Sequence, residues 1–289
     1  MRTGPRFLVA EGNTRKRCEE TRRAGLRDGS ECYRQSLMLL CPEASVDIIF
    51  ASEPDTQLPT GAELKAYDGV VVGGSGLNLP GGETNPEIVR QVDFTKAVFE
   101  AGVPFFGSCW GLQIAAVAAG GKVAKSPRGR ELNVARKLTL TPEGRGSLMY
   151  EGKALVFDSM AIHLDEVTHL PPGSVLLASN AHTTVQAAII THNGGTFWGV
   201  QYHPEFDVPH LAGLIENYTH ALIPEGFFDD LGSLKLYTSH LRELAENPER
   251  SDLRWLLGID ADVLDDRLRL HEVGNWITHQ VYPAMIRKQ

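Results

Sequence analysis

A chain of 289 residues is long enough to bury a large core, and its 42% hydrophobic and 22% charged residues are ordinary for a globular protein. Its 28 basic and 36 acidic residues give a net charge of −8, which argues against nucleic acid and against an anionic membrane surface as partners. The four cysteines show neither metal-ligand spacing nor a disulfide framework, and no apolar run resembles a signal peptide or a membrane span, so we expect a cytoplasmic protein that needs no metal and no cofactor.

The N-terminal part predicts a strand over residues 7–10, followed by a strongly charged insert at residues 11–34. We interpret the arginines of this insert as a solvated helix face or a mobile loop. The alternative is a basic lid near the site that attracts a substrate carboxylate. Beyond it, the pattern predicts a helix over residues 31–40 and strands over residues 46–50 and 67–72.

A glycine cluster follows the third of these strands directly. The sequence Gly73-Gly74-Ser75-Gly76 requires a sharp turn or a close approach to a ligand, and such loops point N–H groups at an anion. The cluster lacks the Lys-Ser/Thr of a Walker loop, so it is weak evidence for a phosphate site. A helix is predicted next over residues 85–101, because Asn85 suits the N-cap, Pro86 the first helical position and Gly102 the end.

The stretch from Pro104 to Gln113 predicts a buried strand, a very tight turn and a helix. Cys109 lies at the corner, and the flanking Gly107 and Gly111 allow close packing and a strained turn. Unpaired N–H groups and the helix dipole favour a thiolate at this position. The same geometry with serine is the nucleophile elbow of hydrolases. Cys109 is therefore a candidate nucleophile, although a small buried cysteine at a helix start would show the same local pattern.

Strands and helices alternate through this part of the chain, which predicts an α/β fold with a mainly parallel sheet. In such sheets, ligands bind at the carboxyl ends of strands. The glycine cluster and Cys109 both follow such ends, so we expect the site there.

The second half predicts further strands and then helices. Strands are expected over residues 137–140, 154–157, 174–177, 184–190 and 196–202. The last two are expected to form a hairpin through Asn193-Gly194-Gly195. A helix over residues 209–222 is followed by a helical extension, in which leucines at helical spacing predict three helices, the third over residues 263–279. Trp255 and Trp276 are predicted to lie in the core of this extension.

A cysteine nucleophile needs a base, and the base needs an orienting group. Ten histidines make any single one weak evidence. His203 stands out because it ends an apolar strand and is followed by Pro204-Glu205, whose carboxylate is close enough in sequence to bond the imidazole and fix its tautomer. Taken alone, His203 would more simply be a surface or core residue.

Together these segments resemble the class I, or triad-type, glutamine amidotransferases, in particular the stand-alone proteins similar to the amidotransferase domain of GMP synthase. The match lies in Gly107-Ser108-Cys109-Trp110-Gly111-Leu112-Gln113 and Gln201-Tyr202-His203-Pro204-Glu205, and it extends to the glycine cluster, Arg130-Glu131 and His163-Leu164-Asp165. The resemblance implies a flavodoxin-like amidotransferase domain over residues 1–222, with a mostly parallel central sheet flanked by helices, and a helical C-terminal extension over residues 223–289.

The resemblance also implies a role for each matching position. Cys109 would attack the γ-carbonyl of glutamine or of a γ-glutamyl amide, His203 would transfer protons and Glu205 would orient His203. The backbone N–H groups of Gly74 or Ser75 and of Trp110 would hold the oxyanion. The substrate-binding residues that the resemblance implies are Gln113, Arg130 and Glu131.

Three functions are compatible with these residues. The first is hydrolysis of glutamine or a γ-glutamyl-amine through a glutamyl thioester, which releases glutamate and ammonia or an amine. The second is a glutaminase subunit that delivers ammonia to a separate synthetase partner, with the aromatic, helical tail as docking face. The third is an inert binding or regulatory module, against which the intact Cys109, His203 and Glu205 speak.

The length of the tail bears on this choice. About 67 residues are too few for an ATP-binding amination domain of roughly 100–150 residues, so we do not expect the chain alone to use ammonia. A cysteine peptidase on a similar elbow is disfavoured, because the His-Pro-Glu strand end fits amide transfer better.

Overall fold

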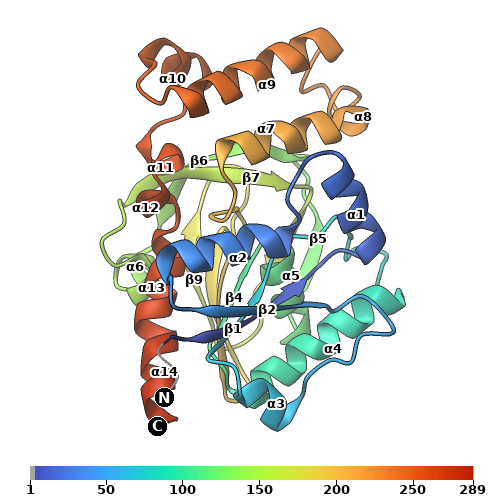
Figure 1. The fold of residues 1–289 in the computed structure, drawn as a ribbon, viewed down its shortest axis with the longest axis vertical. Coiled ribbons are helices and arrows are strands. Elements are labelled where there is room, and N and C mark those ends of the chain that lie inside the picture. Colours follow the sequence, from blue (N-terminus) through green and yellow to red (C-terminus); the bar gives the residue numbers. More distant parts are fainter. Residues whose placement is uncertain (1–3, 289) are drawn as a thin grey trace.

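The computed structural model describes residues 4–288, so Met1 to Thr3, with which the predicted domain over residues 1–222 begins, and Gln289, with which the predicted extension ends, lie outside the described residues. A nine-stranded sheet forms the centre of the molecule (Figure 1), in the order β2-β1-β3-β4-β11-β10-β9-β6-β7. Its strands are β1 (Arg6–Glu11), β2 (Ser45–Phe50), β3 (Gly69–Val72), β4 (Phe105–Ser108), β6 (Glu131–Leu140), β7 (Val156–His163), β9 (Ser174–Ser179), β10 (Ala187–His192) and β11 (Gly195–Val200). A separate two-stranded sheet pairs β5 (Lys122–Lys125) with β8 (Asp165–His169).

The half of the sheet that carries the predicted site is parallel. β2, β1, β3, β4 and β11 are parallel neighbours, whereas β10, β9, β6 and β7 extend the sheet with antiparallel pairs. The carboxyl ends of β3, β4 and β11 therefore meet at one edge, where the glycine cluster, Cys109 and His203 follow them. The predicted α/β fold with a C-terminal set of helices is confirmed.

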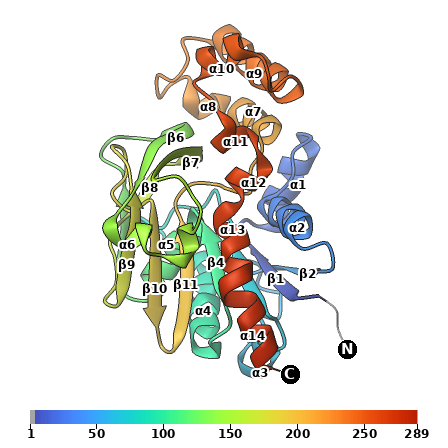
Figure 2. The same ribbon diagram turned by 90° about the vertical axis from the view of Figure 1, so that its left-hand side faces the viewer.

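Helices cover both faces of this sheet (Figure 2). Side chains of β1 alternate between two cores, with Phe7 and Val9 on the face of α2 and the C-terminal helices, and Leu8 and Ala10 on the face of α4 and α5. This is the two-residue period of a strand buried on both sides. The helices before the C-terminal segment are α1 (Arg15–Arg23), α2 (Gly29–Leu40), α3 (Gly61–Lys65), α4 (Pro86–Ala101), α5 (Trp110–Ala118), α6 (Pro142–Arg145), a short 3₁₀ turn (Leu148–Tyr150), α7 (Val208–Asn217) and α8 (Thr219–Leu222).

Capping and turn residues in the sequence predicted several elements correctly. The Asn85 side chain accepts a hydrogen bond from the backbone N–H of Glu87, Pro86 opens α4, and Gly102 ends it with φ 66°. The hairpin between β10 and β11 is confirmed, and Asn193 and Gly194 adopt the positive φ angles that its turn requires. Polar capping residues and φ > 0 turn residues act within a few residues of chain, which is why they are readable from sequence.

The C-terminal residues form two pieces with different environments. α9 (Leu231–Glu246) packs on α7, and α10 (Ser251–Leu257) packs on α9, at one end of the molecule (Figure 1). The chain then returns along the sheet (Figure 2) through α11 (Ala261–Leu264), α12 (Asp266–Arg269), α13 (His271–Trp276), a π-helical turn (Ile277–Val281) and α14 (Tyr282–Arg287). Trp276 packs on Phe7 and Phe106, with ring centroids 5.7 and 5.8 Å away. The returning piece therefore belongs to the central core, and the predicted boundary between residues 222 and 223 stays a prediction.

Some sequence predictions are wrong in detail. Trp276 is fully buried, but it lies in the central core and not in a core of the extension itself, and Trp255 is 85% exposed, on the face of α10 opposite the buried Leu253 and Leu257. The helix predicted over residues 209–222 is interrupted at Tyr218, and the one predicted over residues 263–279 is divided into α11, α12, α13 and the start of the π-helical turn. The charged insert is ordered as α1 and the start of α2. None of the helices within residues 4–288 combines the length and the apolar character that a bilayer crossing requires.

Candidate active site

Cys109 lies at a strained corner between β4 and α5. Its backbone has φ 50° and ψ −101°, a conformation that non-glycine residues rarely adopt. The corner is tight because the flanking glycines leave no room for a side chain, and a Cβ on Gly111 would lie 2.2 Å from the carbonyl oxygen of Val72. The predicted strained turn and close strand–helix packing are confirmed. The Trp110 N–H belongs to the first residue of α5, where backbone donors have no intrahelical partner.

His203, Glu205 and Ser108 form a buried chain of hydrogen bonds beside this corner. The Nδ1 atom of His203 lies 2.8 Å from Oε1 of Glu205. The Ser108 hydroxyl donates to the same Oε1 atom, also over 2.8 Å. His203 and Glu205 are each 2% exposed. A carboxylate held by two donors in a dry environment fixes both the orientation and the tautomer of the imidazole, with the proton on Nδ1 in the neutral ring.

The ring of His203 is also fixed from one face. Phe206 stacks on it, with centroids 4.1 Å apart and planes 5° from parallel. Among residues 4–288, the buried Nε2 atom has no hydrogen-bond partner, which leaves it available to the Cys109 thiol. Burial by itself lowers the pKa of His203, but the Glu205 carboxylate and the adjacent Cys109 thiol outweigh this effect and raise the pKa to about 10.

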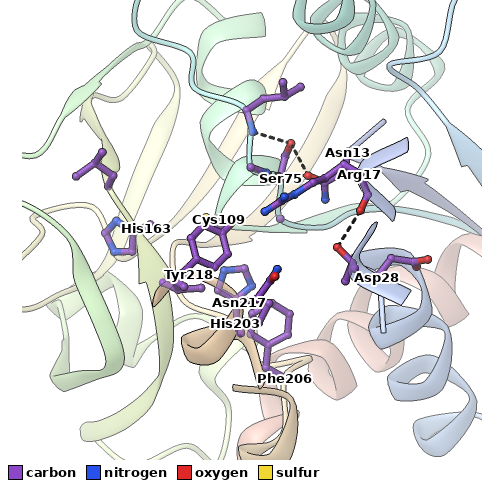
Figure 3. Close-up of a pocket in the computed structure, with 18 of the residues that line it drawn as sticks. Asn13, Arg17, Asp28, Ser75, Cys109, His163, His203, Phe206, Asn217 and Tyr218 are labelled. Atoms are coloured by element: carbon purple, nitrogen blue, oxygen red, sulfur yellow. Dashed lines mark hydrogen bonds between the residues drawn. The ribbon is translucent and has the colours of Figure 1, made fainter. Parts of the chain in front are cut away.

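Cys109 and His203 open into one cavity of about 240 Å3 (Figure 3). This is smaller than the roughly 300–1,000 Å3 of pockets for drug-sized ligands, and it suits a substrate of amino-acid size. Gly74 and Ser75 of the glycine cluster line it, and a Cβ on Gly74 would lie 2.8 Å from Cε1 of His203. The Ser75 hydroxyl donates to the Gly12 carbonyl oxygen, so its side chain anchors the cluster to the end of β1.

The three residues expected to bind substrate are placed differently. Gln113 lines the cavity, but its amide group donates to the carbonyl oxygen of Asp165. Arg130 also lines it and is held by a two-pronged ion pair with Glu225, at 2.8 and 3.0 Å. Glu131 is not among the lining residues. It lies behind His163, whose Nε2 atom is 2.8 Å from the Glu131 carboxylate.

The opposite wall of the cavity comes from the charged insert. Arg17 and Thr21 on α1 and Arg27 and Asp28 before α2 line it, together with Asn13. In Figure 3, Asn13, Arg17 and Asp28 lie across the cavity from His163. We call the group Arg17, Thr21, Arg27 and Asp28 the insert wall. The basic lid that the sequence left as an alternative thus has a structural counterpart, because two of the insert's arginines face the cavity.

Sequence reasoning missed several lining residues. Tyr218 lies at the break between α7 and α8, where the guanidinium groups of Arg17 and Arg130 lie 5.8 and 6.0 Å from its ring centroid. His210 also lines the cavity, and burial together with the Arg27 charge lowers its pKa to about 4. Phe206 was detectable as the residue directly after His-Pro-Glu, and His210 as one helical turn further on, whereas Tyr218 had no local signal.

Comparisons with known proteins agree with this geometry. The family described as glutamine amidotransferase class-I matches residues 39–218. A protein named gamma-glutamyl-L-1-hydroxyisopropylamide hydrolase from a Pseudomonas species is 32% identical over an alignment of 293 residues, which covers 98% of this chain and 95% of that protein. A glutamine-hydrolysing GMP synthase of an Enterobacter species is 40% identical over 139 residues, which are 45% of this chain and only 25% of the synthase.

Solved structures support the same fold. A glutamine amidotransferase from Thermotoga maritima superposes with a TM-score of 0.62 at 17% identity, covering 93% of this chain and 98% of that one. A glutamine amidotransferase from Methylobacillus flagellatus superposes with a TM-score of 0.55 at 19% identity, covering 98% of this chain and 94% of that one. The family match spans more than half of the chain, and the similarity to the Pseudomonas hydrolase spans nearly all of it. The chain belongs to the class I glutamine amidotransferase family and is an enzyme of the amidohydrolase type.

Proposed function

We propose that this chain hydrolyses a γ-glutamyl amide through a glutamyl thioester on Cys109, releasing glutamate and an amine. The observation that carries the proposal is the cavity shared by Cys109 and His203, with the His203 ring held by Glu205 at 2.8 Å and its Nε2 atom left for the thiol. A nucleophile, a base and an orienting carboxylate in this order form the minimum set for acyl transfer.

The first half-reaction forms the thioester. The sulfur of Cys109 attacks the γ-carbonyl carbon, and its proton passes to Nε2 of His203. The oxyanion that forms is stabilised by the Trp110 N–H and by the backbone of Gly74 or Ser75, a contribution commonly worth about 2.7–4 kcal/mol per donor. When the C–N bond breaks, His203 returns the proton to the leaving nitrogen, and a neutral amine departs.

The second half-reaction consumes one water. His203 takes a proton from the water as it attacks the thioester carbon, and the C–S bond breaks. The sulfur recovers a proton from His203, and glutamate leaves. The raised pKa of His203 favours its protonation in each half, and the imidazolium formed in this way gives its proton first to the leaving nitrogen and later to the sulfur.

Two observations favour an amine over ammonia as the leaving group. The similarity to the Pseudomonas hydrolase covers 95% of that protein, whereas the GMP synthase similarity covers about a quarter of the synthase. In addition, the insert wall extends the cavity beyond the residues that hold Cys109 and His203. Residues 11–34 lie outside the segment that the family description matches, and they contribute part of the cavity lining.

A glutaminase subunit that feeds a separate synthetase is the second candidate. It is favoured by exposed apolar side chains on α9 and α10, where Trp255, Leu256 and Leu236 are 85%, 64% and 59% exposed. A docking surface of this kind would keep the free chain nearly inactive on glutamine until the partner binds.

The test is a panel of γ-glutamyl amides assayed with the purified chain alone: glutamine, a γ-glutamyl alkylamide, a γ-glutamyl alkanolamide and a γ-glutamyl amino acid. We expect turnover of at least one substituted amide at a higher kcat/KM than glutamine, and none with Cys109→Ala. Cys18→Ala removes a buried thiol outside the cavity and is the matched control. Inactivity on every amide, or turnover of glutamine alone, would contradict the proposal, and a glutamine rate that rises only when a synthetase is added would favour the subunit function.

A further inference from the structure

The returning C-terminal piece touches the His203 segment on both sides. Before His203, the Tyr202 hydroxyl donates to Oε1 of Glu272 on α13 over 2.6 Å. After it, the Pro204 carbonyl oxygen accepts a hydrogen bond from Nε of Arg269 on α12 over 3.1 Å. Glu272 is fully buried and Arg269 is 6% exposed, so water does not compete for either contact.

The Tyr202–Glu272 hydrogen bond belongs to a buried network in which both carboxylate oxygens of Glu272 accept hydrogen bonds. The other carboxylate oxygen of Glu272 accepts from Nζ of Lys153 at 3.1 Å. The Tyr150 hydroxyl lies 2.8 Å from that of Tyr202, and because Tyr202 uses its single proton toward Glu272, Tyr150 is the donor of this pair. A fully buried carboxylate with charge-assisted donors on both oxygens is stiff, because any displacement leaves a charge unpaired.

The same C-terminal piece also contacts the strand that leads to Cys109. Trp276 packs against Phe106 of β4, three residues before the nucleophile. One segment therefore contacts β4 and the chain after β11, the two parts that carry Cys109 and His203. It lies outside the region that the family description matches, residues 39–218.

We propose that Glu272 and Arg269 are positioning residues that hold His203 at its working distance from Cys109, by fixing Tyr202 and Pro204 on either side of it. The inference rests on the proposed function for the role of His203. The backbone of His203 itself makes two hydrogen bonds: its N–H donates to the carbonyl oxygen of Met160 at 2.8 Å, and its carbonyl oxygen accepts from the N–H of Phe206 at 3.5 Å. A displacement of about 1 Å in a catalytic group commonly costs about a hundredfold in rate, so loss of either flanking contact is expected to lower kcat.

The chain offers a matched pair of variants for the test. Tyr202→Phe removes the hydroxyl that links residue 202 to α13, whereas Tyr150→Phe removes a hydroxyl from the same buried network and leaves that link intact. We expect Tyr202→Phe to lower kcat by about 10- to 100-fold with KM within about threefold of wild type, and Tyr150→Phe to stay within about threefold in both. Arg269→Met, which removes the donor to Pro204, is expected to act like Tyr202→Phe.

A second readout does not depend on the substrate. The rate at which iodoacetamide alkylates Cys109, measured by mass spectrometry of its peptide across pH, reports whether His203 still withdraws the thiol proton. We expect Tyr202→Phe to slow this alkylation at neutral pH by about tenfold, while Tyr150→Phe follows wild type. Thermal unfolding of both variants separates a local displacement from loss of the fold.

The outcomes are distinguishable. If Tyr202→Phe and Tyr150→Phe lose kcat and alkylation rate equally, the positioning role is contradicted whatever the substrate. If wild type hydrolyses no amide but Tyr202→Phe still slows alkylation selectively, the positioning role holds and the proposed function fails. If wild type is active and neither variant changes kcat or alkylation, the proposed function stands and the positioning role is overturned.

Discussion

The two walls of the cavity are built in different ways. On one side, Cys109, His203 and Glu205 are 6%, 2% and 2% exposed, and each is fixed by strain, stacking or buried hydrogen bonds. On the insert wall, the side chains of Arg17 and Arg27 are 38% and 27% exposed and pair with acidic partners that also reach solvent, Arg27 with Asp207 at 2.6 Å. Fixed groups define one reaction geometry, whereas half-exposed charges exchange partners at small cost.

This difference predicts two kinds of mutational effect. A change on the fixed side weakens stabilisation of the transition state of the chemical step, which all amides share, so kcat falls for every amide. A change on the insert wall alters binding of the part of the substrate that varies, so the ranking of amides changes while kcat does not. The predictions below test this division, beginning with the largest expected effect.

Glu205→Gln is expected to lower kcat by about 10³- to 10⁴-fold for all amides, because the amide group no longer enforces the His203 tautomer or stabilises the imidazolium. The Glu205 carboxylate raises the pKa of His203, so its removal lowers that pKa, and the imidazolium is then lost at a lower pH. The alkaline limb of the pH–rate profile should accordingly move to lower pH.

Ser108→Ala is the matched control for this change. It removes the second donor to the same Glu205 oxygen but keeps the carboxylate and its bond to His203. We expect a loss of about tenfold or less, with the alkaline limb nearly unmoved. A Glu205→Gln enzyme that retained wild-type kcat, or whose alkaline limb moved upward, would show that Glu205 does not act through His203.

Gly74→Ala is expected to lower kcat by about a hundredfold. The added Cβ would lie 2.8 Å from Cε1 of His203, and the ring cannot retreat because Phe206 stacks on it and Glu205 holds Nδ1. Gly76→Ala, two residues along the same loop, would place its Cβ 3.5 Å from the Tyr218 hydroxyl, an ordinary contact, and should stay near wild type. Equal losses in the two variants would attribute the effect to loop flexibility and not to His203.

The fixed wall was also the part that the sequence could predict. Cys109 between two glycines at a strand–helix corner, and His203 with Glu205 two residues on, are local patterns, and the structure brings both segments to one edge of the parallel sheet. Their catalytic roles stay predictions until they are measured. The folding of these segments follows from turn, cap and strand signals that operate over a few residues.

The insert wall could not be predicted in the same way. The arginines at 17 and 27 look like any solvated basic stretch, and only the packing of α1 and α2 at the carboxyl edge of the sheet turns them toward the cavity. Tertiary packing also determines which tryptophans of the C-terminal extension are buried. Trp255 and Trp276 have the same helical context in sequence, yet one is exposed and the other fills the space above Gly69, where a Cβ would lie 2.6 Å from its ring.

Arg17→Met is the substitution with the smallest expected effect, and it tests the role of the insert wall most directly. The methionine side chain keeps an unbranched apolar stem but loses the guanidinium group and its charge, so an amide whose leaving amine carries a carboxylate should show a KM about fivefold higher, as for a half-exposed ion pair. Amides of uncharged amines should change by less than about twofold, with kcat unchanged throughout. Lys16→Met removes an exposed charge from the same helix, outside the cavity lining, and controls for net charge. An equal rise of KM for all amides would instead place Arg17 against the glutamyl half, which every substrate shares. Arg17 would then not select among leaving amines, and the proposed division between the fixed side and the insert wall would fail at that residue.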